Sequence, residues 1–508
     1  MALFDQAGLL LFLATAIVAV LVYRAWTAST SPLFHIPAPW YANFTGNVLK
    51  YHTVAGRRMF YIHALHQKYG PVVRISPYEV SVADPDSFIA IHRMGSGFNK
   101  ARFYKDFIGK SKPGIFSMTD TRDHAARRKL FARAFSTSSL RENCEVTVRE
   151  KVEKAVERIS TEAKEGCADI HKWWMLMATD IVGQLCFGES FGMLELGEKN
   201  HYVQVLDAVA SASTIRYELP WLHSVLCRLP LKSMQLITNT RGEMFAYSKR
   251  AVENLRRNRD NKSNLFATIL AECGTGIDGN ERLVEDIVRG EAANMMIAGS
   301  DTVSSSLTYL IWSILKRPGL LERLTQELSG LDNNFDDAEL ERLPLLNAVI
   351  NESLRLYGSV QGSMPRTTPA SGVTFCGIFI PGGTVVTTQT YTMHRLSEVF
   401  PDPFRWVSLN AGTLTEAAYQ FDHRFDEKRF LPGNPTERQK QVFSPFGSGS
   451  RSCLGVSLAK MEMRLATVLL LRRFPGLKLS DKMTDEMMEM ASFMIVKPVA
   501  NKCDVTSS

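Results

Sequence analysis

A single cysteine in a glycine-rich run carries the most chemical information in this chain. Cys453 lies in the run 446–455, FGSGSRSCLG, and a helix-prone segment follows from Val456 to Arg464. We therefore expect the thiol at a helix N-terminus, where exposed backbone N–H groups and the helix dipole lower a thiol's pKa and favour the thiolate. A thiolate suits iron as a ligand, and it pushes electron density onto the metal in a way that promotes O–O cleavage.

The residues around this cysteine suit a flat cofactor with carboxylate groups. Gly449 and Gly455 fit positions where the backbone turns tightly or lies against a macrocycle. Phe446 can shield the sulfur, and Arg451 can pair with an anionic propionate. An ordinary buried cysteine beside a Gly/Ser turn is the alternative, but the full spacing of the run argues against it.

The run resembles the haem-binding loop of the cytochrome P-450 family, Phe-x-x-Gly-x-Arg-x-Cys-x-Gly, at every fixed position. The resemblance covers nearly the whole chain, from the proline-containing hinge through the run 68–71 (KYGP) to the C-terminus, and is fungal in style. It implies the cytochrome P-450 fold, which is mainly α with small β-sheets. It also implies haem b (iron protoporphyrin IX) with Cys453 as the metal ligand, and Phe446, Gly449, Arg451 and Gly455 around the cofactor.

A long apolar segment supplies a second motif. The stretch from Glu285 to Lys316 is too apolar in its middle for a surface helix, so we expect it to cross the interior. Its centre, AGSDT at 298–302, offers the Thr302 hydroxyl and the Asp301 carboxylate for relaying protons in a dry site. The motif resembles the family's oxygen-activation sequence. The alternative is a threonine that only bonds back to the carbonyl four residues earlier.

An acid and a base on the predicted helix 345–356 form a third motif. Glu352 and Arg355 share one helix face at a spacing of three residues, so they can pair. Most such pairs are solvated and contribute little. Here they resemble the family's Glu-x-x-Arg, whose charges hold a third arginine, and Arg429 is the candidate. We expect this trio to support folding and haem retention, not chemistry.

The propionate groups of the haem need cationic partners, and the resemblance indicates which residues supply them. His124 and Arg128 lie one helical turn apart and align with the family positions that face the propionates. Arg366 occupies the strand position after Glu-x-x-Arg that reaches the same groups. Each of the three, taken alone, could equally be a surface residue.

Charge and cysteine usage exclude several other classes of protein. The chain of 508 residues has 59 basic and 52 acidic side chains, and this diffuse excess of +7 is not a nucleic-acid footprint. It suits an acidic redox partner or anionic lipid headgroups, although a solvated surface without a partner explains it equally well. The eight cysteines form no Cys-x-x-Cys pair, so we expect neither a disulfide framework nor a zinc site.

The N-terminus predicts a single-pass anchor. Residues 7–23 are uncharged and apolar, and Arg24 follows them directly. The positive-inside bias then places the bulk of the chain in the cytosol. A cleaved signal peptide is the rival, but it would prefer a basic region before the apolar run. We expect an anchor over residues 1–26, a proline-containing hinge over 27–43, and one catalytic domain over 44–508.

Two segments read as strand pairs, and one segment does not fit the family. The stretches 72–76 and 79–82 predict one hairpin, and 377–388 predicts a second that turns at 381–383. The piece 407–423 is longer than the family needs between its neighbours. It is either a loop insertion or an intron translated in frame.

These features together predict a membrane-anchored haem-thiolate monooxygenase. The resemblance implies that one atom of O2 is inserted into a lipophilic small molecule, with fungal secondary metabolism the first expectation. NADPH-cytochrome P-450 reductase would supply the electrons and the endoplasmic reticulum membrane would hold the anchor. The substrate pocket would include Ala298, Val360 and Phe493. The rivals are a haem-thiolate isomerase or dehydratase that needs no reductase, and a non-catalytic haem or lipid carrier.

Overall fold

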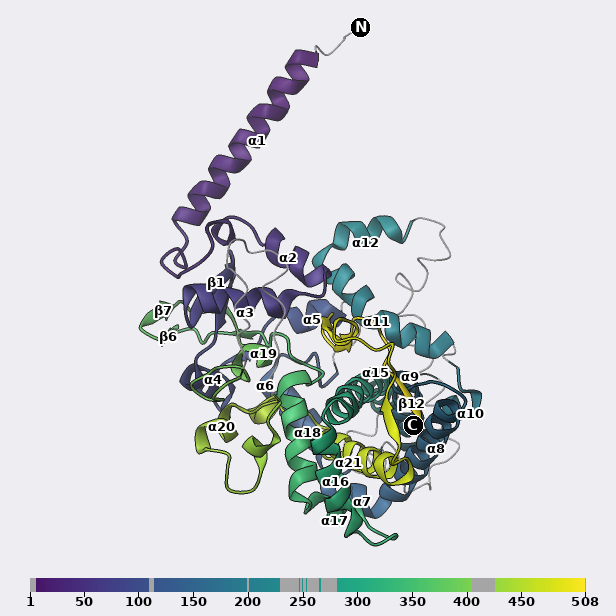
Figure 1. The fold of residues 1–508 in the computed structure, drawn as a ribbon. Coiled ribbons are helices and arrows are strands. Elements are labelled where there is room, and N and C mark those ends of the chain that lie inside the picture. The colour runs from purple at the N-terminus through teal and green to yellow at the C-terminus, as the bar shows by residue number, and fades with distance from the viewer. Residues whose placement is uncertain are drawn as a thin grey trace.

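The computed structural model describes residues 6–108, 114–198, 201–228, 281–403 and 425–507, with a few isolated positions between 246 and 265. Figure 1 shows a mainly helical body from which the first helix extends. The piece 407–423 lies outside the described residues, so its two interpretations both remain open. The predicted fold class, mainly helical with small sheets, is confirmed within the described ranges.

Helices make up most of the body. Their bounds are α1 Gln6–Ser29, α2 Asn47–Val54, α3 Arg58–Tyr69, α4 Pro85–His92, α5 Phe103–Ile108, α6 Thr121–Ala132, α7 Thr137–Asn143, α8 Glu145–Lys164, α9 Ile170–Phe187, α10 Met193–Leu196, α11 His201–Glu218, α12 Pro220–Leu226, α15 Glu281–Leu315, α16 Pro318–Ser329, α17 Asp337–Glu341, α18 Pro344–Tyr357, α19 Thr390–Met393, α20 Glu437–Val442 and α21 Val456–Arg473.

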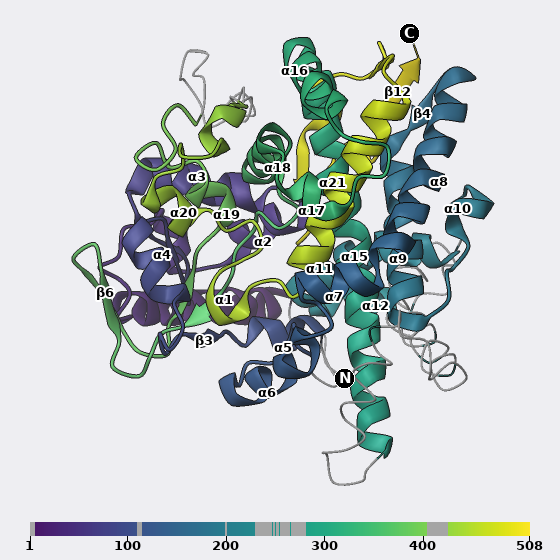
Figure 2. The same cartoon turned by 90° about the horizontal axis from the view of Figure 1, so that it is seen from below.

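Helix α15 crosses the interior of the structure, as its apolar sequence predicted. It packs along α9 and also contacts α18 and α21. Figure 2 shows α15 and α21 together, with α8 and α9 on one side and the part that carries β3 and β6 on the other. Leu307, Leu310 and Ile314 are fully buried in its C-terminal half, and so are the small polar residues Ser304 and Thr308, so this half of the helix lies in the interior.

Short strands form small sheets beside the helices. Their bounds are β1 Val72–Ser76, β2 Glu79–Val82, β3 Asn99–Lys100, β4 Ala168–Asp169, β5 Arg366–Thr367, β6 Val373–Phe375, β7 Ile378–Ile380, β8 Val385–Thr387, β9 Leu477–Leu479, β10 Met490–Ser492, β11 Val496–Pro498 and β12 Asp504–Ser507. The largest sheet among them has the order β1-β2-β8-β5-β3. The first predicted hairpin is confirmed, because β1 and β2 pair antiparallel.

The second predicted hairpin is wrong in its pairing. Strands β7 and β8 both form, but β7 pairs with β6 and β8 pairs with β2 and β5. The turn that closes the real hairpin is Cys376–Gly377, with φ angles of 47° and 77°. Positive φ at both central residues gives the tight turn that matches strand twist, and the prediction missed it because Cys376 is an unusual residue there.

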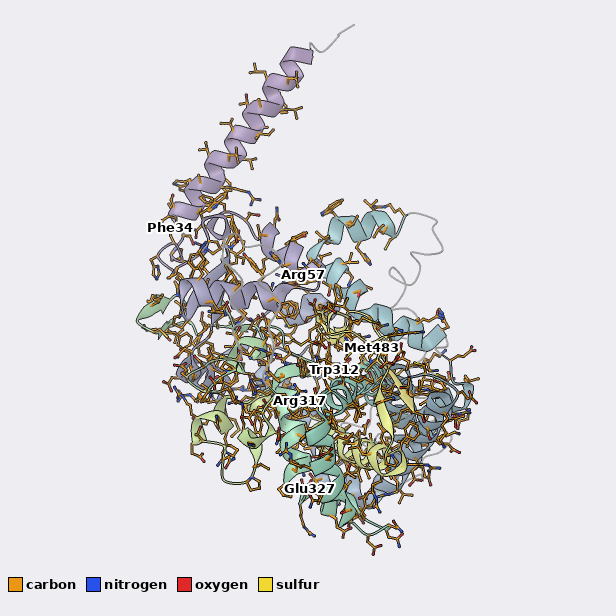
Figure 3. All side chains as sticks on the ribbon, viewed as in Figure 1. Phe34, Arg57, Trp312, Arg317, Glu327 and Met483 are labelled. Atoms are coloured by element: carbon orange, nitrogen blue, oxygen red, sulfur yellow. The ribbon has the colours of Figure 1, made fainter. Side chains whose placement is uncertain are left out.

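The N-terminal helix projects from the body, but the segment after it does not. Its stretch Leu10–Ser29 is long and apolar enough to cross a membrane, a test that signal sequences also pass. Figure 3 shows the side chains of α1 standing clear of the body, with Phe34 at the junction. Leu33 and Ile36 are buried in the apolar cluster of the large sheet, and Arg24 donates to the carbonyl of Phe44 at 3.0 Å. The predicted hinge therefore begins inside α1 and is packed against the domain.

Candidate active site

One large cavity connects the base of α1 with the interior. Its volume is about 1660 Å³, and its lining includes Tyr23 and Arg24 of α1 as well as Cys453. Most of the sequence-predicted site residues line it, although they come from distant parts of the chain. These are His124, Arg128, Ala298, Thr302, Val360, Arg366, Phe446, Arg451, Cys453 and Gly455.

Cys453 lies on the loop that precedes α21, three residues before the helix begins. Its backbone N–H donates to the carbonyl of Phe446 at 2.7 Å, which closes the loop. The sulfur is accessible from the cavity. Burial raises the pKa of the Cys453 thiol, and the Gly455 N–H and the Arg128 charge offset only part of that effect. In the protein without its cofactor the pKa of this thiol is therefore raised and not lowered as expected, and a metal bound by the sulfur would favour the thiolate.

The glycine at 449 is required by the close approach of the neighbouring helix α4. Gly449 has a φ of 64°, and it does not line the cavity. A Cβ at this position would lie 1.9 Å from the carbonyl oxygen of His92, at the end of α4. The residue thus lets the cysteine loop approach α4 closely.

Five basic side chains gather on one side of the cavity near the cysteine loop. Lys100, His124, Arg128, Arg366 and Arg451 all line it. Arg128 donates to the Ser452 carbonyl at 2.7 Å, and Arg366 donates to the Tyr104 hydroxyl at 3.1 Å. Within the described ranges no ion pair joins any of the five to an acid. We call this group the cation cluster.

The members of the cation cluster repel one another. Burial, and then Arg366, Arg451 and Arg128, lower the pKa of Lys100 well below its ordinary value. Burial and the same kind of neighbours lower the pKa of His124 to about 3, so this imidazole is neutral at pH 7. Cationic side chains that lie together without an ion-paired acid are costly unless an anion binds among them. This side of the cavity is therefore suited to an anionic ligand.

Lys100 was not predicted from the sequence. It lies in the two-residue strand β3, outside any motif, and its ammonium donates to the Phe116 carbonyl at 2.6 Å. The signal that could have found it is weak. A lysine three and four residues before the aromatic residues 103 and 104 can lay its apolar stem along those rings and direct its ammonium to a polar partner.

The centre of α15 contributes Ala298 and Thr302 to the lining of the same cavity. The Thr302 hydroxyl donates to the Ala298 carbonyl at 2.6 Å, as the alternative interpretation expected. Gly299 is explained by helix packing, because a Cβ there would lie 2.3 Å from a methyl group of Val182 on α9. This contact gives the mid-helix glycine a reason that involves no cofactor.

Asp301 does not line the cavity. Its side chain is 4% exposed and points to β11, where the Lys497 ammonium lies 3.0 Å from Oδ2. Asp301 is therefore next to Thr302 in the sequence, but its carboxylate points away from the cavity. It forms an ion pair with Lys497 in the two-stranded sheet of β10 and β11, which we call the C-terminal sheet.

The turn between β10 and β11 reaches the cavity through a different residue from the one expected. Phe493 packs on Gly56, with ring atoms 3.0 Å from where a Cβ would be, and does not line the cavity. Met494 lines it instead, with a φ of 93° that reverses the chain. Successive side chains of this turn point to opposite sides, so Met494 faces the cavity and Phe493 faces away. The sequence carries no signal for a methionine at positive φ.

The Glu-x-x-Arg pair forms inside the protein as expected from its spacing. Arg355 donates through Nε and Nη2 to the two oxygens of Glu352, each at 2.7 Å, and both side chains are fully buried. Arg429 joins through a longer contact of 3.7 Å to Glu352. Arg355 also donates to the His394 carbonyl at 2.7 Å, and the His394 ring accepts from the Ser444 N–H ahead of the cysteine loop.

Comparisons with known proteins agree with this site. A family model described as Cytochrome P450 matches residues 36–502. The chain is 38% identical to the cytochrome P450 monooxygenase tazI of Aspergillus terreus, over 95% of this chain and 94% of that protein. It is 40% identical to the cytochrome P450 monooxygenase stcB of Emericella nidulans, over 94% and 89% of the two chains.

The fold is also found among solved structures. The chain superposes on the structure titled "Retinoic acid bound cyanobacterial CYP120A1" with a TM-score of 0.68 at 19% identity, covering 87% of this chain and 93% of that one. The predicted resemblance and fold are thus confirmed. The chain belongs to the cytochrome P450 family and is a haem-thiolate monooxygenase.

Proposed function

We propose that this protein is a membrane-anchored monooxygenase that holds haem b through Cys453 and oxidises a lipophilic small molecule of fungal secondary metabolism. The observation that carries the proposal is the position of the Cys453 sulfur. It opens into a large cavity that also contains the cation cluster and the Ala298–Thr302 face of α15.

The cation cluster supports haem b as the cofactor. Haem b carries two propionate carboxylates, which would supply the anions that Arg128, Arg366 and Arg451 lack among the described residues. Lys100 and neutral His124 can donate further hydrogen bonds to the same groups. Cys453 would hold the iron through its sulfur, and Phe446 would shield that sulfur from water.

When bound, the haem supplies reductive activation of dioxygen, and the protein supplies the conditions for it. The apolar cavity wall excludes water and holds an apolar substrate beside Ala298 and Val360. Thr302 keeps a hydroxyl at the cavity wall, from which it can donate a proton when its bond to Ala298 is exchanged. Asp301 stands one residue away, as a carboxylate linked to the C-terminal sheet.

The electron donor we infer is NADPH-cytochrome P-450 reductase, with α1 anchored in the endoplasmic reticulum membrane and the body in the cytosol. The apolar, exposed surface of α1 and the basic residue at its cytosolic end support this arrangement. The fungal monooxygenases that resemble the chain support secondary metabolism as its setting.

Expression in a host with the reductase, followed by metabolite profiling under isotopically labelled dioxygen, tests the proposal. The expected result is a product that carries one labelled oxygen and forms only with NADPH and reductase present. Cys453→Ala in the same host is the negative control. A product formed without NADPH would favour an isomerase or dehydratase, and a normal haem spectrum with no oxidised product would favour a carrier.

A further inference from the structure

A polar side chain interrupts the apolar face that α15 turns toward the cavity. Asn294, Ala298 and Thr302 follow one another at four-residue spacing, and all three line the cavity. At 1.5 Å per residue, Asn294 lies about 12 Å along the helix from Thr302. It therefore stands two turns away from the proposed oxidation site.

Asn294 is held in place by a buried acid. Its Nδ2 donates to Oε2 of Glu291 at 3.3 Å. The Glu291 carboxylate, 2% exposed, also accepts the Ile115 N–H at 2.8 Å and the Arg127 guanidinium at 3.0 Å. Because three N–H donors converge on it, this carboxylate acts as an acceptor. The amide of Asn294 must then turn its nitrogen to Glu291 and its oxygen away.

The nitrogen side of the amide is also enclosed. A Cβ on Gly114 would lie 2.1 Å from Asn294 Nδ2, so a side chain at position 114 would clash with this amide. Oδ1 has no hydrogen-bond partner among the described residues, and the half-buried side chain borders the cavity. The amide is thus an oriented acceptor whose oxygen has no hydrogen-bond partner in the described part of the chain.

Other polar groups on this face of α15 are occupied. The Thr302 hydroxyl donates to Ala298, and the Ser306 hydroxyl pairs with that of Ser359 at 2.6 Å. Asn294 differs from both because its acceptor has no partner in the described part of the chain. An oriented but unsatisfied acceptor in an apolar cavity is a means of selecting a hydroxyl group, since a ligand without one leaves it unpaired.

We propose that Asn294 determines specificity by accepting a hydrogen bond from a substrate hydroxyl. The substrate class is then an extended apolar molecule with an alcohol or phenol at the end remote from the oxidised carbon. Glu291 is a positioning residue for this contact. The inference rests on the proposed function, because it takes the haem at Cys453 as the other end of the binding site.

Paired probes test it on the haem-loaded, full-length protein. The probes are 4-phenylphenol and biphenyl, which differ by one hydroxyl, and the readout is the blue shift of the haem absorption band when a ligand displaces iron-bound water. For the parent protein we expect 4-phenylphenol to bind roughly 3- to 10-fold more tightly than biphenyl, the gain from one net hydrogen bond. In Asn294→Leu we expect this ratio to fall to about 1.

Ile297→Val is the matched control, because it changes an apolar wall residue on the same helix. We expect it to change the affinity of both probes alike and to keep their ratio. An unchanged ratio in Asn294→Leu would overturn the proposal, as would a red shift that places the hydroxyl on the iron, or the absence of any shift in the parent.

The carbon monoxide spectrum of each variant separates this proposal from the proposed function. If the parent lacks the band of thiolate-ligated haem, the proposed function fails. If that band is normal and the ratio of affinities does not depend on Asn294, only the further inference fails.

Discussion

Lys497 on β11 lies 3.0 Å from Asp301 on α15, and this ion pair joins the C-terminal sheet to the helix that carries Thr302. The side chains are 16% and 4% exposed, so the pair is largely shielded from water. It fixes the direction of the Asp301 carboxylate, away from the cavity. A change at Lys497 therefore acts on the residue that precedes Thr302 in the chain.

Replacing Lys497 with Met should destabilise the protein, because Asp301 is then left buried without this partner. We expect a loss of roughly 1–3 kcal/mol in the free energy of unfolding, measured by urea titration of the haem-loaded protein. Lys497→Arg should recover most of the loss, and so should Asp301→Asn combined with Lys497→Met. Equal stability of Lys497→Met and the parent would show that the pair contributes nothing.

Thr302→Val removes the hydroxyl and keeps the side chain's shape. If the hydroxyl serves only its bond to Ala298, little should change. We expect instead that the variant binds haem and substrate and still consumes NADPH, while product per NADPH falls and hydrogen peroxide rises. Positioned proton transfer contributes about 10²–10⁴-fold, so the change should be well outside assay error.

Thr302→Ser is the matched variant for that measurement, since it returns a hydroxyl to the same place. It should recover part of the coupling between NADPH use and product. Coupling that stays at the parent value in Thr302→Val would mean that the hydroxyl is structural.

Removing one partner of the Glu352–Arg355 pair should give haem-poor, unstable protein. Both side chains are fully buried, and loss of either leaves the other charge unpaired at a cost of roughly 3–5 kcal/mol. The measurements are haem per polypeptide and the urea midpoint for Glu352→Ala and Arg355→Ala. Lys440→Ala is the control, because its pair with Glu437 has the same spacing but is exposed. Normal haem content in either buried variant would refute the structural role.

Several neutral histidines should make the protein sensitive to acid. Burial lowers the pKa of His63, His92 and His394 to about 3 and that of His66 to about 4. Between pH 6.5 and 4 the unfolded chain therefore binds protons that the folded chain does not, so stability falls as the pH falls. Each such histidine costs up to about 1.4 kcal/mol per pH unit in that window.

Urea midpoints at pH 7.5, 6.5 and 5.5 test this expectation. The midpoint should fall moderately between pH 7.5 and 6.5 and more steeply between 6.5 and 5.5. His92→Gln, which keeps a polar partner for the Thr388 hydroxyl, should make the decline shallower. A midpoint independent of pH would contradict the neutral histidines.

The sequence predicted most of the helices that position the site, because their apolar periodicity and motif spacing are local properties. The long helix, the Glu352–Arg355 pair and the loop before Cys453 all formed where expected. The failures involve contacts between distant segments. The pairing of β8 with β2, the turn of Asp301 toward Lys497 and the exchange of Phe493 for Met494 depend on packing that no local pattern encodes.

The glycines illustrate the same limit. Gly299 and Gly449 stand in motifs that pointed to a cofactor, yet each is required by a neighbouring helix, α9 and α4 respectively. Lys100 is the opposite case. It belongs to no motif, and the folding of the chain brings it into the cation cluster. A sequence motif can therefore locate a site, but the contacts that require each residue of the motif become visible only in the structure.

The carbon monoxide difference spectrum of reduced Cys453→Ala tests the central claim most directly. We expect the parent to show the red-shifted band of thiolate-ligated haem and the variant to lack it. Cys186→Ala is the matched control, because Cys186 is a buried cysteine that lines the same cavity, and it should keep the band. A red-shifted band that survives in Cys453→Ala would contradict the assignment of Cys453 as the iron ligand.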